Sequence, residues 1–160
     1  MNAKTQPAND RELVLERVLD APVEKVWRCW SDPKLLQQWF APKPWTITAV
    51  DMDLRPGGRS NTVMRSPEGQ EFPNSGVILE VVPERRIVMT DAFTADWQPV
   101  DGTPFFVAIV SFEPAPGGGT KYTAVARHWT RENREKHEQM GFHEGWGQCA
   151  DQLGELARSL

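Results

Sequence analysis

The histidines are the first residues to consider for chemistry, because a neutral imidazole can act as a base or bind a metal ion. The chain has three of them, His128, His137 and His143. On a helix, the six-residue spacing of His137 and His143 turns their side chains about 120° apart, too far to share a metal ion as an i, i+4 pair can. His128 lies between Arg127 and Trp129 on a segment of strand character, where a packed or solvent-facing histidine is a simpler interpretation than a catalytic base. We therefore expect no metal site.

The cysteines and the charges on predicted strands offer little more. Cys29 and Cys149 lack the C-x-x-C spacing of a metal or redox site, so we expect free thiols that serve packing. Asp53, Arg59 and Asp91 could point inward, but their register is open. The chain contains no G-x-S-x-G nucleophile motif. The sequence thus identifies no catalytic residue and no cofactor.

Aromatic residues are the most distinctive feature of the chain. Residues 26–40 hold Trp27, Trp30, Trp39 and Phe40, so three of the seven tryptophans fall in fifteen positions. Because an indole is large and apolar but needs a partner for its N–H, such a cluster indicates a core corner, a ligand cavity or a contact surface. Trp27 and Trp30 share one face of a predicted helix, and we expect them to pack in the core.

The elements that must hold these residues alternate between strand and helix periodicity. Pro22 and Pro33 suit the first turns of two short helices, the second capped by Ser31 or Asp32. Segments of alternating apolar and polar residues, separated by turn residues, predict one strand before these helices and six after them. The predicted strands cover residues 12–20, 46–54, 58–66, 75–82, 87–93, 104–113 and 120–129. The segment 94–103 between two of them has no strong pattern and is a candidate flap that carries Trp97.

The last thirty residues predict one long amphipathic helix over roughly 131–159, which begins after Thr130. Gly141, Gly145 and Gly147 are unfavourable inside a helix, and they suggest a kink or the close approach of another element. The predicted fold class is α+β, with an antiparallel sheet of six or seven strands and a helix laid across it.

Length and charge limit the class of protein. The 160 residues suit one domain, and we expect a flexible N-terminus over 1–10 and a single domain over 11–160. Eighteen basic and twenty-two acidic residues give a net charge of −4 with no block of like charge, which disfavours nucleic acid and membrane surfaces as partners. No signal peptide or membrane-spanning run is recognisable, so we expect a cytoplasmic protein. Residues 105–112 are apolar on both faces of their strand, which a homodimer contact or a covering loop would explain.

Four segments carry a resemblance to a known family. The chain resembles the Hsp90-ATPase-activator homologue (AHSA1-like) proteins of the START, Bet v 1 and polyketide-cyclase superfamily, over about residues 12–160. The segments are APVEKVWRCWSDPKLLQQWFAP, DLRPGGRS, SGVILEVVPERRIVMTDAF and GFHEGWGQCADQLGELARSL. The resemblance implies the helix-grip fold, in which a curved antiparallel sheet wraps a long C-terminal helix and leaves a cavity between them.

The resemblance also suggests where a ligand would bind. It places one rim of the cavity at the end of the second helix, and the glycine-rich start of the long helix opposite. The expected cavity-lining residues are Trp39, Phe40, Trp45, Phe142 and Trp146. Our first hypothesis is binding of a small apolar or amphipathic molecule, which needs no catalytic group. The alternatives are a cyclase- or hydratase-like enzyme and a chaperone-associated interaction module; the eukaryotic activators carry an additional N-terminal domain, which makes a chaperone contact doubtful here.

Overall fold

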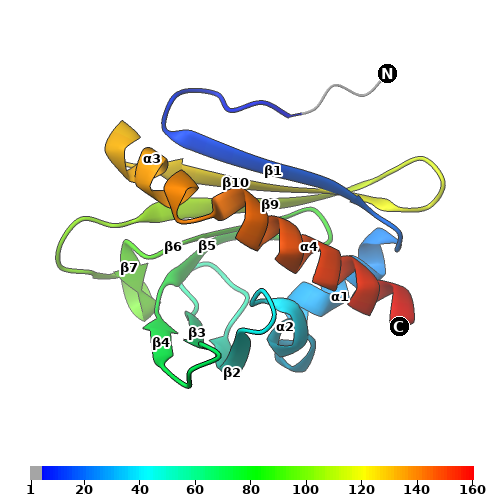
Figure 1. The fold of residues 1–160 in the computed structure, drawn as a ribbon, viewed down its shortest axis with the longest axis horizontal. Helices are drawn as coiled ribbons and strands as arrows, with labels where there is room; N and C mark the ends of the chain where they lie inside the picture. The colour runs from blue at the N-terminus through cyan, green and yellow to red at the C-terminus, as the bar shows by residue number, and fades with distance from the viewer. Residues whose placement is uncertain (1–4) are drawn as a thin grey trace.

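The computed structural model describes residues 5–160, so residues 1–4 of the expected flexible N-terminus lie outside the described residues. A five-stranded antiparallel sheet forms the centre of the molecule, in the order β1-β10-β9-β6-β5 (Figure 1). Its strands are β1 (Glu12–Leu19), β5 (Val77–Val82), β6 (Arg86–Thr90), β9 (Phe106–Pro114) and β10 (Thr120–His128).

Two smaller sheets complete the β structure. One is three-stranded, in the order β2-β3-β4, and a bridge between Arg59 and Val77 connects it to β5. The other is a two-stranded hairpin, β7 with β8, around a 3-10 turn over Ala95–Trp97. These strands are β2 (Thr46–Met52), β3 (Ser60–Arg65), β4 (Glu71–Asn74), β7 (Phe93–Thr94) and β8 (Gln98–Pro99). The sequence prediction missed β4, β7 and β8, because these strands are too short to show a periodicity.

Helices α1, α3 and α4 pack on the five-stranded sheet, which α4 crosses diagonally, and α2 lies against β2 of the smaller sheet (Figure 1). They are α1 (Val23–Ser31), α2 (Pro33–Trp39), α3 (Arg131–Gln139) and α4 (Phe142–Ser159). The Asp32 carboxylate accepts a hydrogen bond from the backbone N–H of Lys34 at 2.9 Å, which confirms the predicted cap of the second helix. This is the α+β helix-grip fold.

The predicted single helix over 131–159 is wrong in one respect, because the chain breaks at Met140 and Gly141. Gly141 has φ +98°, a left-handed conformation that ends one helix and starts the next in a new direction. Gly147 faces β1: a Cβ there would lie 2.6 Å from Nη2 of Arg17, the far end of a flexible side chain, and 3.7 Å from Cδ1 of Leu15. The glycine cluster therefore includes a break at Gly141 and a contact with β1 at Gly147.

The core lies between the sheet and the helices. Leu13, Ala126, Ala108, Met89 and Ile78 are paired side by side across the five strands, and all are buried. On the opposite face, half-buried Ile109 lies in a row of valines. Ile109, from the apolar second face of residues 105–112, thus belongs to this cross-strand row, whereas Val107 lies between Arg127 and Thr90.

Candidate functional site

Four of the five expected cavity residues form one chain of packed rings. Trp39 and Phe40, at the end of α2, have ring centroids 5.3 Å apart, and Phe40 lies 6.4 Å from Trp146 of α4. Phe142 is 5.8 Å from Trp146 along the same helix. Trp45 is the exception, because it packs on Phe72 of β4 at 5.6 Å instead. We call Phe40, Phe106, Phe142 and Trp146 the aromatic site, since Phe106 of β9 also lies 6.5 Å from Trp146.

Burial separates core residues from residues that remain accessible. Trp39 and Phe142 are each only 2% exposed, and the indole N–H of Trp39 donates to the backbone carbonyl of Cys29 at 3.0 Å. Phe40, Phe106 and Trp146 are half-buried. Within the part of the chain that the structure describes, the indole N–H of Trp146 has no hydrogen-bond partner. Trp39 is therefore a core residue, whereas Trp146 has both an apolar face and a free donor.

The inner face of β2 and β3 continues the apolar surface toward α4. Ser60 lies opposite Met52 and Thr62 opposite Val50, and Ser60 Oγ is 3.6 Å from Met89 Sδ of the central sheet. Met52 and Val50 are only half-buried although they pack against the core. The backbone of α4 approaches β1 and the other helices more closely than it approaches β2 or β3.

Beside the aromatic site lies a histidine pair that the sequence analysis did not foresee. His128 Nε2 is 2.9 Å from His137 Nδ1, and His128 Nδ1 is 2.8 Å from the carbonyl oxygen of Arg11. Burial, and then the neighbouring His128, lower the pKa of His137 to about 4. Burial lowers the pKa of His128 as well. The two residues are nine apart on different elements, so no helical or strand spacing could have paired them.

The remaining chemical candidates have structural partners. Arg59 pairs with Asp51 at 2.9 Å on the surface, and Asp53 pairs with Arg55 at 2.7 Å. The Asp91 carboxylate accepts hydrogen bonds from the backbone N–H groups of Phe105 and Phe106 and so fixes the start of β9. Among the described residues, no group of three or more His, Cys, Asp or Glu side chains is placed to hold a metal ion.

The two cysteines are free thiols. Burial raises the pKa of Cys29 to about 11 and that of Cys149 to about 12. Such thiols stay protonated near neutral pH, and a protonated thiol is a poor nucleophile. Their surroundings fit the packing role expected from the sequence.

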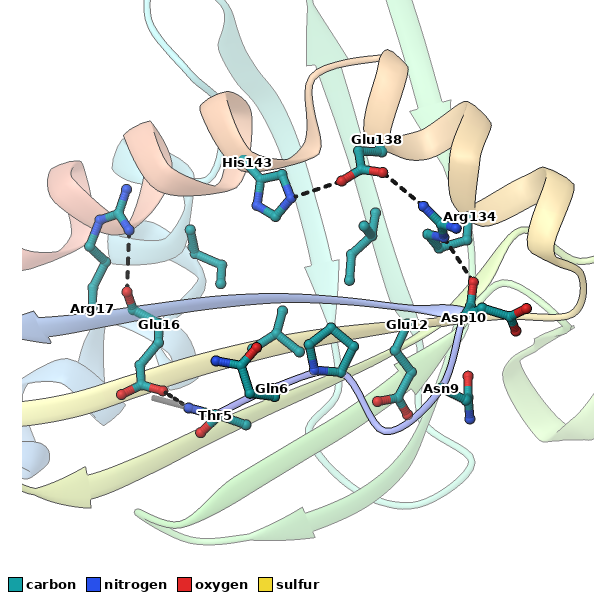
Figure 2. A pocket seen from close by; sticks show the side chains of 14 residues that line it. Thr5, Gln6, Asn9, Asp10, Glu12, Glu16, Arg17, Arg134, Glu138 and His143 are labelled. Carbon is teal, nitrogen blue, oxygen red and sulfur yellow. Dashed lines mark hydrogen bonds and ion pairs between the residues drawn. The ribbon is translucent and has the colours of Figure 1, made fainter. Parts of the chain in front are cut away.

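A surface groove of about 520 Å³ lies apart from the aromatic site, between the N-terminal segment, β1 and the helices α3 and α4 (Figure 2). Its charged side chains bind one another: Arg134 donates to Glu138 at 2.8 Å and to the carbonyl oxygen of Asp10 at 2.8 Å. The N–H of Thr5 donates to the Glu16 carboxylate at 2.7 Å. These contacts attach the N-terminal segment to the domain. The groove is open to solvent, and its lining combines charged and polar side chains with Pro7, Leu13 and Leu15.

Comparisons with known proteins agree with this architecture. A family model described as Activator of Hsp90 ATPase homolog 1-like protein matches residues 20–158. A solved structure from Nitrosomonas europaea is 46% identical, covers 94% of this chain and 96% of that one, and has a TM-score of 0.89. One from Mycobacterium smegmatis is 28% identical over 92% and 90% of the two chains, with a TM-score of 0.77. One from Chromobacterium violaceum is 26% identical over 91% and 96%, with a TM-score of 0.73.

A search of curated proteins found no match. None of the described helices combines the length and apolar character needed to cross a membrane.

Proposed function

The chain belongs to the Activator of Hsp90 ATPase homolog 1-like family, and from this premise we propose that it binds a small apolar or amphipathic ligand between its sheet and helix α4. The ligand contacts the accessible rings of the aromatic site, with Trp39 packed behind them. Trp45, in the loop before β2, packs on Phe72 of β4 instead of on these rings.

The observation that carries the proposal is the convergence of half-buried rings from three distant segments. Phe40 ends α2, Phe106 begins β9 and Trp146 lies in the second turn of α4. An ordinary core would bury these rings, as it does Trp30 at 1% exposure. Apolar rings that meet without full burial offer a ligand the area that drives its binding.

A few polar groups on the inner face of β3 and on α4 would orient such a ligand. The hydroxyl groups of Ser60 and Thr62 lie on the inner face of β3, and the indole N–H of Trp146 is without a partner among the described residues. Ligand pockets in proteins combine a mostly apolar lining with a small number of such groups. This composition favours an amphipathic molecule over a purely aliphatic one.

Titration with a neutral fluorescent apolar probe, N-phenyl-1-naphthylamine, tests the proposal. We expect saturable binding to the native protein at about one probe per chain. Trp146→Ala should weaken binding several-fold, because it removes a large part of the apolar contact. Trp97→Ala is the matched control, since Trp97 is 49% exposed and lies in the hairpin of β7 and β8 outside the aromatic site.

Two results would contradict this assignment. Absence of saturable probe binding to the wild type would contradict the proposed function. An equal loss of probe affinity in both tryptophan variants would show that the probe binds outside the aromatic site. Native mass spectrometry of the freshly purified protein provides a second, probe-free measurement, in which a retained small molecule appears as a mass adduct.

A further inference from the structure

The hydrogen bonds of the histidine pair determine which nitrogen carries each proton. A carbonyl oxygen can only accept, so the 2.8 Å contact with Arg11 requires a proton on His128 Nδ1. A neutral imidazole carries one N–H, and Nε2 of His128 is then an acceptor. The 2.9 Å contact therefore requires that His137 Nδ1 donates to it. In the neutral pair, His137 Nε2 is left as an unprotonated acceptor.

The imidazole ring that carries this acceptor lies among the rings next to the proposed binding region. The centroid of the His137 ring is 4.7 Å from Phe105, 5.0 Å from Phe106 and 5.2 Å from Phe142. Phe106 and Phe142 are the two residues of the aromatic site that connect this ring to Trp146. His137 and Trp146 thus both contact the ring of Phe106 and both contact the ring of Phe142.

The free nitrogen of His137 also borders accessible space. The residue is only 8% exposed. Every fully enclosed side-chain nitrogen and oxygen in the described part of the chain has a hydrogen-bond partner. His137 Nε2 has none there, so it belongs to the small fraction of the residue that stays accessible. A side chain buried by more than nine-tenths with one open acceptor is a feature that a ligand can satisfy.

We propose that His137 Nε2 accepts a hydrogen bond from the hydroxyl or N–H group of a neutral aromatic ligand bound at the aromatic site. The inference deepens the proposed function and rests on it. His128 acts as the positioning residue, because its fixed tautomer holds the proton of His137 on Nδ1.

The surroundings select for a neutral donor over an anion. The lone pair on Nε2 repels a carboxylate, and a buried imidazole resists the proton that would reverse this preference. The positive charge of Arg134, on helix α3 with His137, also disfavours protonation of His128. A phenol-like ligand meets these conditions because it combines an aromatic ring with one neutral O–H.

Calorimetric titration with three matched probes, 2-naphthol, 2-methoxynaphthalene and 2-naphthoate, tests the inference at pH 7.5. The first two share a ring system, but only naphthol can donate. We expect the wild type to bind naphthol about 3- to 10-fold more tightly than the methoxy compound, the range of one net neutral hydrogen bond, and to bind naphthoate most weakly. In His137→Phe, which keeps a ring at this position, the preference for naphthol should disappear while 2-methoxynaphthalene still binds.

The outcomes separate this inference from the proposed function. An equal preference for naphthol in the wild type and the variant, or naphthoate binding as tight as naphthol, would overturn the role of His137 and leave ligand binding intact. Failure of all three probes and of N-phenyl-1-naphthylamine to bind the wild type would overturn both. If His137→Phe does not fold, ¹⁵N spectra of the wild-type histidines decide: naphthol, but not the methoxy compound, should shift the His137 Nε2 resonance, and an unchanged resonance rejects the assignment.

Discussion

Trp30 and Trp146 show the two ways in which this domain uses an indole. Trp30 is 1% exposed, its N–H donates to the hydroxyl of Tyr122 at 3.3 Å, and Trp39 and Phe40 lie at its edges. Trp146 keeps part of its ring and its N–H accessible. The Trp30 ring and its N–H thus have all their contacts within the protein. The Trp146 ring and N–H can still gain binding free energy from contacts with a ligand.

This contrast predicts different costs for the same substitution. Trp30→Ala should lower the free energy of unfolding by at least the 3–5 kcal/mol typical of a truncated core aromatic, because it leaves a cavity and an unpaired Tyr122 hydroxyl. Trp146→Ala should cost roughly 1–3 kcal/mol, since part of that ring already contacts solvent. Urea denaturation at constant temperature measures both values. Equal losses above about 3 kcal/mol, with unchanged probe binding, would make Trp146 an ordinary core residue.

At the scale of elements, the junction between α3 and α4 decides which residues meet. Glycine spacing suggested a kink, but it could not locate the break at Gly141 or give the new direction of the chain. That direction packs α3 against the end of β10, and this contact brings His137 to His128. A continuous helix would have carried His137 along the α4 axis. The contact between His128 and His137 therefore depends on the left-handed conformation of Gly141.

Substitution of the glycines by alanine tests this junction. Gly141→Ala should lower the free energy of unfolding by about 1–2 kcal/mol, because φ +98° is unfavourable for a residue with a Cβ. Gly145→Ala is the control: nothing lies within 4 Å of the added Cβ, and the site is inside α4. This variant should gain roughly 0.5–1 kcal/mol through helix propensity. Denaturant melts of both proteins measure the difference, and a neutral or stabilising Gly141→Ala would show that the break is not required.

The attachment of α3 should depend on pH through the histidine pair. Both folded-state pKa values lie below the ordinary value near 6.5, that of His137 at about 4. Between these pH values the two histidines bind more protons in the unfolded chain than in the folded chain. The free energy of unfolding therefore falls as the pH drops from about 6.5 toward 4. We expect His137 to account for about 2 kcal/mol of this loss, allowing for partial solvent screening.

Two variants isolate this contribution from the carboxylates that titrate in the same range. His137→Gln can still donate to His128 Nε2 but does not titrate, so its stability should depend less on pH than that of the wild type. His143→Gln replaces an exposed histidine outside the pair and is the matched control. Thermal melts between pH 4.5 and 7.5 give the comparison, and identical slopes for all three proteins would rule out the pair as the source.

At the scale of the whole molecule, sequence periodicity and motifs predicted the order of the helices and strands. They could not predict contacts between segments that lie far apart in the sequence. The α2 cap at Asp32 follows from local spacing, and so does the packing of Trp27 and Trp30. The separation of Trp45 from Trp146 depends on β4, a strand of four residues with no pattern of its own. The sequence therefore named Phe40, Phe142 and Trp146 of the aromatic site but missed Phe106, because the position of Phe106 beside Trp146 depends on a contact between distant segments.

Ligand binding should also be visible in the stability of the whole domain. A molecule that binds only the folded state adds about 2.7 kcal/mol to the free energy of unfolding at a hundredfold excess over its dissociation constant. We expect 2-naphthol to raise the melting temperature progressively with concentration, and to do so less in Trp146→Ala at the same concentrations. The Trp97→Ala variant should retain the wild-type response. A probe that merely adheres to loosely packed or unfolded chains would leave the melting temperature unchanged or lower it, and that result would contradict a site built by the folded sheet and helix α4.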